Sequence, residues 1–445
     1  MNVPADVGNV PSAELAARAA SLVQANQAEQ AAELYDCLLQ RDPQHRDALN
    51  FFATQALAAG KIAQSIGLYQ RALALHAEDA GLYKNLGLAL RNAGRPQEAL
   101  TAFETALRLQ PQYPMVHLHR AALLEERGQA EQALSGYLAA LGQAENLGLV
   151  AQREQLPAGL RQGLEHALRV VRAARADYLA QVLQPLRAQH GDEALARVDR
   201  SLRVYLGLEA ALPGEPKQRC TFMTFQGIPA QGWFERRQFA WFSELEDRTE
   251  EIRAELLAVL GSEEGFRPFI QVPREHPGAK YWEALNDSPN WNAFFFYRDG
   301  RRFADNCRRC PVTAGLLDQL PLSRVAEHSP ESLFSVLKPG AHIPPHTGVI
   351  NTRLVAHLPL IIPPDCGLRV NGETRVWQDH ECLVFDDTFE HEAWNHSPRT
   401  RVVLIFDIWN PYLTAVECEA MRVVVEGIGR FNALHGQIQA AYRNT

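Results

Sequence analysis

The chain has 445 residues, of which 46% are apolar and 22% charged, a composition usual for soluble globular proteins and a length suited to two or three domains. This composition excludes a disordered or collagen-like chain. Lys and Arg number 44 and Asp and Glu 52, for a formal charge of −8. Binding to nucleic acid or to an anionic membrane surface is disfavoured, because both need a cationic face.

Residues 1–20 lack the apolar core of a secretory signal, and no apolar run reaches the roughly 18 residues that a membrane span needs. The seven cysteines are scattered and odd in number, which is typical of a reducing compartment and not of a disulfide framework. We therefore expect a cytoplasmic protein with no membrane span. Cys307-x-x-Cys310 has no second ligand pair beside it, which disfavours a zinc or redox site there.

A pattern with a period of 34 residues runs through the first third of the chain. It is the tetratricopeptide pattern, in which each unit is a helical hairpin whose small residues let two helices approach around an aromatic side chain. We predict about four units over residues 12–146. The recurring positions are aromatic (Tyr35, Tyr69, Phe103, Tyr137), glycine (Gly60, Gly94, Gly128) and small (Ala31, Ser65, Ala99, Ala133). Such an array serves either as a scaffold or dimerisation element, or as a groove that binds a peptide, and the pattern leaves both open.

Residues 147–212 keep apolar positions at three- and four-residue spacing, which predicts a helical linker region with breaks at Pro157 and Pro185. The sequence Pro-Gly-Glu-Pro at 213–216 ends this pattern. We place the main domain boundary there.

Residues 217–415 are richer in aromatic residues, proline and short β-branched runs. Trp241–Gly261 is an exception that predicts one amphipathic helix, and residues 416–445 predict a C-terminal helix. Several short runs between turns predict the strands of a sandwich or jelly roll: Leu333–Leu337, Arg353–Ile362, Gly367–Val370, Glu381–Phe385 and Arg401–Trp409. The predicted fold is therefore multidomain, with an N-terminal α-helical solenoid and a C-terminal jelly roll.

Seven of the 15 histidines lie between His328 and His396, which marks this segment for metal or acid–base chemistry. His346 follows a turn and His391 follows an Asp-Asp loop 45 residues later. Both can therefore sit at one mouth of a jelly roll while lying on different strands.

Arg401 opens the apolar run Val402–Phe406, and a buried guanidinium is costly without an anion. The partner is either a carboxylate ligand or a salt bridge to Asp386, Asp387 or Asp407. In the predicted strand that begins at Arg353, alternation places Arg353, Val355 and His357 on one face. This face is either turned inward to a ligand or exposed at a sheet edge.

From about Pro229 to Pro411 the sequence resembles the aspartyl/asparaginyl β-hydroxylase family of iron(II)- and 2-oxoglutarate-dependent dioxygenases. The animal members also carry tetratricopeptide repeats before the catalytic domain. The motifs that carry the resemblance are Trp233-Phe234 with Phe239-Ala-Trp241, the stretch from Asn306 to Thr313, Lys338-Pro-Gly340, His346-Thr-Gly348, Asn351-x-Arg353, and Phe385 to Trp394.

The resemblance implies a double-stranded β-helix, a cupin-like jelly roll, with one Fe(II), 2-oxoglutarate as cosubstrate and O₂ as oxidant. By position, His346 and His391 resemble the two iron ligands. Arg401 and Ser335 resemble the pair that holds the distal carboxylate of 2-oxoglutarate. His357 resembles the histidine near its chelating end, and Arg353 resembles a catalytic arginine on the substrate side of the iron.

The sequence departs twice from the patterns of related enzymes. Gly348 stands where a carboxylate would complete the common two-histidine-one-carboxylate triad, so a water or another acid fills that position. The animal hydroxylases share this glycine, and we expect Asp387 to act from behind the metal ligands. Val355 stands where the animal enzymes have a second arginine. The aspartate substrate of those enzymes is therefore not expected for this chain.

These observations predict a dioxygenase that hydroxylates an unactivated C–H bond, in a side chain of a peptide or protein recruited by the repeats. One alternative is the same chemistry on a small molecule or lipid. Another is an interaction protein whose jelly roll is inactive.

Overall fold

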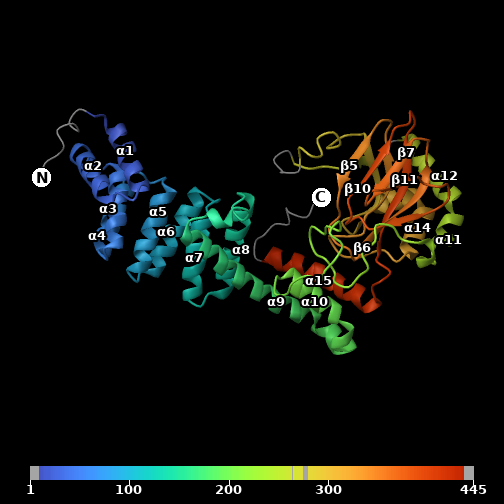
Figure 1. Cartoon of the computed structure of the whole chain (residues 1–445), viewed down its shortest axis with the longest axis horizontal. Helices are drawn as coiled ribbons and strands as arrows, with labels where there is room; N and C mark the ends of the chain where they lie inside the picture. The colour runs from blue at the N-terminus through green and yellow to red at the C-terminus, as the bar shows by residue number, and fades with distance from the viewer. Residues whose placement is uncertain (1–9, 263, 274–278, 435–445) are drawn as a thin grey trace. The chain divides into compact units, whose positions relative to one another are not determined.

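The computed structural model describes residues 10–262, 264–273 and 279–434 (Figure 1). The chain divides into two compact units. The first is formed by residues up to Ala174, and the second by Arg175–Ala433.

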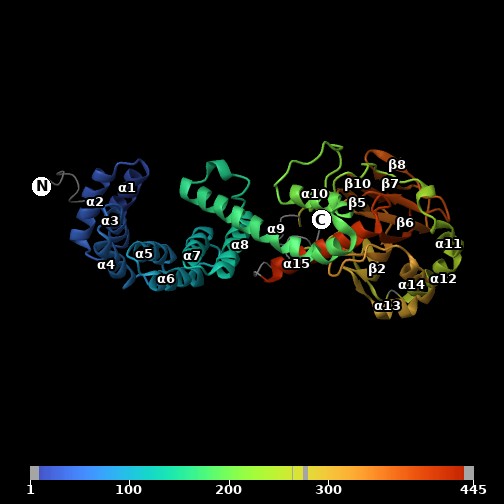
Figure 2. The same cartoon turned by 90° about the horizontal axis from the view of Figure 1, so that it is seen from below.

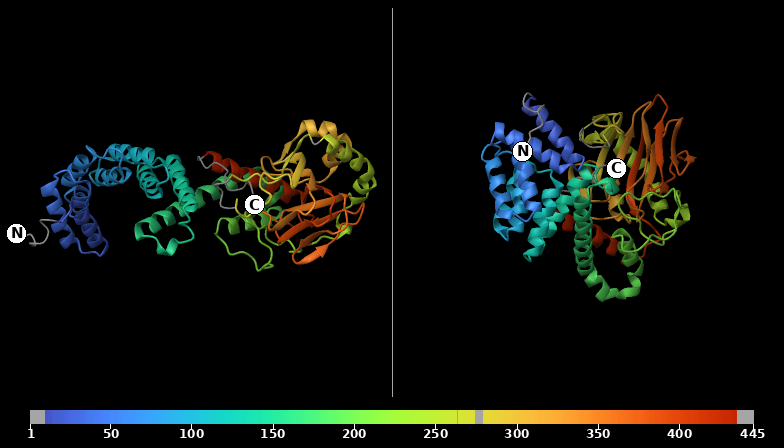
Figure 3. Two further views of the ribbon diagram at one scale, coloured as in Figure 1. Left: turned by 90° about the horizontal axis from the view of Figure 1, so that it is seen from above. Right: turned by 60° about the vertical axis from the view of Figure 1, so that its left-hand side comes forward.

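The first unit consists of helical hairpins that stack side by side into a curved array (Figure 3). Its aromatic column lies between the helices, where Tyr69, Phe103 and Tyr137 are almost completely buried. A Cβ atom added at Gly87 would come within 2.5 Å of the Phe103 ring, so the small residue sets the distance between the paired helices. The hairpin helices are α1 (Ser12–Gln24), α2 (Ala28–Arg41), α3 (Arg46–Ala58), α4 (Ile62–Leu73), α5 (Ala80–Asn92), α6 (Pro96–Leu109), α7 (Pro114–Glu126) and α8 (Ala130–Asn146).

The predicted linker region differs from the expectation in three places. Residues 147–157 form turns and the short η1 (Arg153–Gln155), and α9 (Ala158–Ala194) continues through Pro185. The break within α9 is instead at Gly191, which has a φ of 79°. After α10 (Ala196–Tyr205) the helix ends, so residues 206–212 are not helical.

The second unit contains two antiparallel sheets. The larger has the order β1-β2-β4-β11-β6-β9 with β3 beside β2, and the smaller has the order β5-β10-β7-β8. Strands of the larger sheet are β1 (Phe266–Pro268), β2 (Trp291–Arg298), β3 (Arg301–Arg302), β4 (Ser332–Leu337), β6 (Arg353–Ile361), β9 (Leu383–Phe385) and β11 (Arg401–Trp409). Those of the smaller are β5 (His342–His346), β7 (Cys366–Val370), β8 (Glu373–Arg375) and β10 (His391–Asn395). The predicted combination of N-terminal helical repeats and C-terminal antiparallel sheets is confirmed.

The larger sheet has an apolar cluster on each face. On the inner face, Leu337 and Val403 pack with Ile343 and Val370 of the smaller sheet. On the outer face, short helices cover the sheet through residues such as Leu256 and Leu317 (Figure 2). These helices are η2 (Arg236–Gln238), α11 (Phe242–Asp247), α12 (Thr249–Ser262), α13 (Ala304–Arg309) and α14 (Pro311–Gln319). The single helix predicted for Trp241–Gly261 is therefore two helices.

The last helix, α15 (Ala415–Leu434), packs through Met421 and Val424 against the end of α9 and α10. An ion pair of 2.6 Å between Arg197 and Glu417 joins α10 to α15. The predicted C-terminal helix is present as far as Leu434, and residues 435–445 lie outside the described part of the chain. Within the described ranges, no helix has the length and apolar character of a membrane span.

The repeat packing yields a stability prediction. Phe103→Ala removes a ring that is 0% exposed, so we expect the free energy of unfolding of the repeats to fall by about 3–5 kcal/mol. Far-UV circular dichroism during denaturant titration measures this change. Leu75→Ala, at a side chain that is 62% exposed, is the matched control and should change stability by less than about 0.5 kcal/mol. Equal effects of the two substitutions would contradict the packing described here.

Candidate functional site

Two histidines lie opposite each other on neighbouring strands of the smaller sheet. His391 of β10 is the register partner of His346 of β5, and their ring centroids are 4.0 Å apart. The strand pairing therefore brings together two imidazoles that are 45 residues apart in the sequence.

The tautomers of both rings are set by the backbone. His346 Nδ1 lies 2.8 Å from the Pro344 carbonyl oxygen, and His391 Nδ1 lies 3.0 Å from that of Phe389. A carbonyl only accepts, so each Nδ1 carries the proton and each Nε2 keeps a lone pair, as in metal-binding histidines. Burial lowers the pKa of His346 to about 3 and that of His391 to about 4, so both are neutral at physiological pH.

Arg401 and Ser335 lie side by side on the inner face of the larger sheet. Ser335 pairs with Val403 across β4 and β11, so Arg401 lies one alternation further along the same face. The Arg401 side chain is 1% exposed, and its Nη1 is 3.4 Å from Ser335 Oγ. The guanidinium also lies 5.2 Å from the centre of the Trp377 ring, and Nε has no hydrogen-bond partner.

The salt bridge considered for Arg401 is absent among the described residues. Asp387 and Asp407 both accept from Arg353, at 2.8 and 3.1 Å, and Asp386 accepts from Gln218. Burial lowers the pKa of Arg401 to about 10, which still leaves it charged near neutrality. Arg401 is therefore a buried cation without a carboxylate, and a carboxylate ligand fits it.

His357 lies on the inward face of β6, which decides between the inward and the exposed orientation that the sequence left open. Its Nδ1 accepts a hydrogen bond of 3.3 Å from Trp377 Nε1, and burial, followed by the charge of Arg401, lowers its pKa well below the usual value. The ring of Phe385 lies 5.2 Å from that of His357 and 5.3 Å from that of His391. Phe385 thus connects the Arg401 side of the site to the histidine pair.

Gly348 leaves space for an acid from another strand. A Cβ atom at Gly348 would come within 2.2 Å of the Asp387 carboxyl carbon, so this carboxylate occupies the volume next to the glycine. Asp387 Oδ2 accepts from Arg353, whereas Oδ1 is buried without a partner. Arg353 therefore lies with the carboxylates of Asp387 and Asp407 and not with Arg401.

The chemistry of these residues fits a metal with few protein ligands and an oxo-acid. No group of three His, Cys, Asp or Glu side chains within the described ranges forms a metal cluster, so the protein offers the imidazole pair. Cys307 and Cys310 are buried free thiols in the outer apolar cluster, and burial raises the pKa of both.

Trp291 and Trp377 also belong to the site, although no motif in the sequence indicates them. Trp291 Nε1 donates to Ser335 Oγ at 3.1 Å, and Trp377 contacts both Arg401 and His357. Trp377 lies between strands, where no periodicity indicates the direction of a side chain. The position of Trp291 in an aromatic strand beside Ser335 follows only from the pairing of β2 with β4.

Two parts of the chain match models of known protein families. Residues 246–411 match the family model described as Aspartyl/Asparaginyl beta-hydroxylase, and residues 52–114 and 84–147 match a tetratricopeptide repeat model. The second unit carries an aspartyl/asparaginyl beta-hydroxylase domain. The helical hairpins of the first unit are tetratricopeptide repeats.

Two curated hydroxylases are similar to this domain. The human protein named "Aspartyl/asparaginyl beta-hydroxylase" is 33% identical over 192 residues, which are 42% of this chain and 24% of the relative. The "Ornithine lipid ester-linked acyl 2-hydroxylase" of Rhizobium tropici is 33% identical over 181 residues, 40% of this chain and 60% of the relative. The chain thus spans about a quarter of the length of the human relative.

Solved structures match the repeats at low similarity. MamA from Desulfovibrio magneticus is 18% identical, with 30% of this chain and 76% of that chain covered, at a TM-score of 0.28. A likeness at this level supports no functional statement.

The contact between Gly348 and Asp387 yields a second stability prediction. In Gly348→Ala the new methyl group displaces the Asp387 carboxylate from Arg353, so we expect a loss of about 1–3 kcal/mol in the stability of the hydroxylase domain. All seven tryptophans lie between Trp233 and Trp409, so tryptophan fluorescence reports the unfolding of this domain. Gly315→Ala, with no atom within 4 Å of the added Cβ, is the control. Unchanged stability of Gly348→Ala would contradict the close contact.

Proposed function

We propose that the chain is an iron(II)- and 2-oxoglutarate-dependent dioxygenase that hydroxylates an unactivated C–H bond. Its substrate is a side chain of a peptide or protein that the repeats recruit. The observation that carries the proposal is the buried Arg401 guanidinium, which has no carboxylate partner among the described residues, in the same β-sandwich as a pair of neutral imidazoles.

His346 and His391 would hold the metal through their Nε2 atoms, because each Nδ1 donates to a backbone carbonyl. Asp387 would not bind the metal itself but would support the residues that do. Its Oδ1 is buried and has no hydrogen-bond partner, so it is available for this role. When bound, Fe(II) with 2-oxoglutarate and O₂ supplies the oxidant that abstracts hydrogen and returns a hydroxyl group.

Arg401 and Ser335 would bind the distal carboxylate of 2-oxoglutarate through charge-assisted hydrogen bonds. Trp291 holds the Ser335 hydroxyl, and Trp377 packs over the guanidinium, so both groups are positioned before the ligand arrives. The neutral His357 lies between Trp377 and Phe385, where it would contact the chelating end of the cosubstrate. The surrounding aromatic rings keep water away from the reacting groups.

The buried cation also disfavours an inactive domain. Leaving a charge buried without a partner destabilises a protein, and apolar residues of similar volume would be at least as stable. The retention of Arg401 together with the histidine pair supports a domain that binds an acid and a metal.

Two further parts of the proposal rest on other features. Tetratricopeptide repeats commonly mediate protein interaction, which supports the recruitment of a peptide or protein. The seven cysteines are free thiols, which supports a reducing, cytoplasmic compartment. A lipid or small-molecule substrate is the second candidate, and the named activity of the Rhizobium relative favours it.

The role of Arg401 yields a prediction. Arg401→Gln loses a charge-assisted interaction of about 1.5–3 kcal/mol, so the 2-oxoglutarate concentration for half-maximal succinate release should rise at least about tenfold. Succinate is measured with Fe(II) in air, and tryptophan fluorescence checks that the variant is folded. Arg237→Gln, at a side chain that is 83% exposed, should behave as the wild type. An unchanged half-maximal concentration in folded Arg401→Gln would refute the cosubstrate role.

A further inference from the structure

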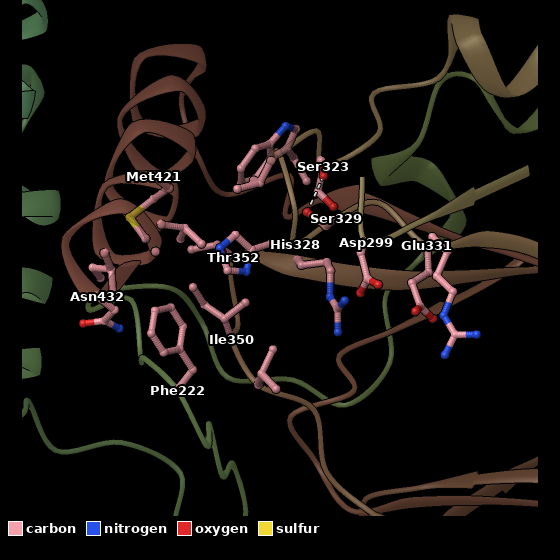
Figure 4. Close-up of a pocket in the computed structure, with 18 of the residues that line it drawn as sticks. Phe222, Asp299, Ser323, His328, Ser329, Glu331, Ile350, Thr352, Met421 and Asn432 are labelled. Carbon is pink, nitrogen blue, oxygen red and sulfur yellow. Dashed lines mark hydrogen bonds between the residues drawn. The ribbon is translucent and has the colours of Figure 1, made fainter. Parts of the chain in front are cut away.

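A cavity of about 430 Å³ lies in the second unit between the β-sandwich and α15. One end is apolar and is formed by Phe222, Ile350, Met421, Val425 and Ile428. The other end is polar, with Asp299 and Glu331 opposite the apolar end in Figure 4. The volume lies within the range of roughly 300–1,000 Å³ that small-molecule sites have.

The cavity wall is connected to the histidine pair through neighbouring residues. Val349 and Ile350 of its wall directly follow Gly348, and Arg353 of its wall donates to Asp387, whose carboxylate lies against Gly348. Arg353 pairs with Trp409 at the end of β11 that is far from Arg401, so the cavity wall lies at the other end of the paired strands.

The polar end carries two carboxylates, Asp299 and Glu331, and two guanidinium groups, Arg298 and Arg353. Arg353 is engaged by both Asp387 and Asp407, so its charge is already compensated. The carboxylate of Glu331 has no hydrogen bond or ion pair to a described residue, although its backbone N–H donates to Asp407. Burial, followed by the charge of Asp407, raises the pKa of Glu331 to about 7.

The other titratable groups of the cavity wall are Arg298, Asp299 and His328. Arg298 stacks at 4.7 Å on the Phe295 ring and donates to the Phe269 carbonyl, and Asp299 lies next to it in the cavity wall. His328 is held neutral because burial lowers its pKa. Because Asp387 and Asp407 outside the wall compensate Arg353, Asp299 and Glu331 face one further guanidinium group, that of Arg298. Ser323 adds a buried hydroxyl without a partner.

We propose that this cavity binds a substrate whose cationic amine or guanidinium group pairs with Glu331 and whose aliphatic segment packs against α15. That the bound molecule is a substrate rests on the dioxygenase function proposed above, whereas the binding of a cation does not. A carboxylate-bearing substrate would meet Glu331 and Asp299 and would find Arg353 already paired, so the site selects against it. Glu331 is the specificity-determining residue.

Amphiphiles that share a tail and differ in head group test whether the cavity prefers a cationic or an anionic ligand. Isothermal titration calorimetry on the full chain compares n-octylamine, n-octanol and octanoate, which share one tail. A second arm compares N-acetyl-leucyl-lysine amide with its glutamate counterpart, so a lipid-like amine and a basic peptide side chain are distinguished. We expect a cationic probe to bind at least about tenfold more tightly than the anionic probe of its arm.

Three variants locate the interaction. Glu331→Gln should remove the preference for the cation and leave octanol binding unchanged, whereas Glu283→Gln, at an exposed site outside the cavity, should retain it. Met421→Trp should weaken octylamine and octanol alike by filling the apolar end. Equal affinities for cation and anion, or tighter octanoate binding that Arg298→Gln abolishes, would overturn the proposal.

The same samples separate this proposal from the dioxygenase function. Binding of 2-oxoglutarate, measured by calorimetry with Fe(II) under anaerobic conditions, should be unchanged in Glu331→Gln. Absence of cosubstrate binding in the wild type would refute the dioxygenase function, while the cation preference would still be decided by the amphiphiles.

Discussion

The Arg401 guanidinium lies inside the β-sandwich, and no carboxylate in the described part of the chain pairs with it, whereas Arg353 in the same domain has two. An unpaired buried charge costs several kcal/mol, and the surrounding residues reduce this cost only partly. Ser335 offers one oxygen and Trp377 one aromatic face. Asp387 and Asp407 pair with Arg353 and leave Arg401 unmatched, so the charge of an acidic ligand can be matched at Arg401.

The two sides of the histidine pair therefore carry different charged groups. Arg401 and His357 lie on one side of the histidine pair, and Asp387, Arg353 and the cavity lie on the other. The proposed cosubstrate and the proposed substrate would therefore use different charged groups, Arg401 for the first and Glu331 for the second. The aromatic rings between them keep the imidazoles and the guanidinium at fixed positions, which lowers the entropic cost of assembling the reacting groups.

The sequence predicted the features that depend on local pattern. The 34-residue period predicted the hairpins because aromatic and small residues recur at the same positions of each unit, and Gly87 against Phe103 is one such contact. Alternation predicted that Arg353, Val355 and His357 share a face of β6, and the contact of His357 with Trp377 shows that this face points inward. Tertiary packing overrode local signals elsewhere, since α9 continues through Pro185 and turns at Gly191. The contacts of Trp377 and the exposure of Glu331 to a cavity depend on which strands and helices meet, and no spacing in the sequence encodes this. The ion pairs of Arg353 with Asp387 and Asp407 likewise could not be predicted without the structure.

The central claim is that the histidine pair and Arg401 together bind Fe(II) and 2-oxoglutarate. Anaerobic addition of Fe(II) and then 2-oxoglutarate to the full chain tests it through the visible charge-transfer band of the iron–oxo-acid chelate. The account predicts a band in the wild type and in His380→Ala, a surface histidine that pairs with Glu250, and no band in His391→Ala. Absence of a band in the wild type at saturating iron, or a full band in His391→Ala, would contradict it.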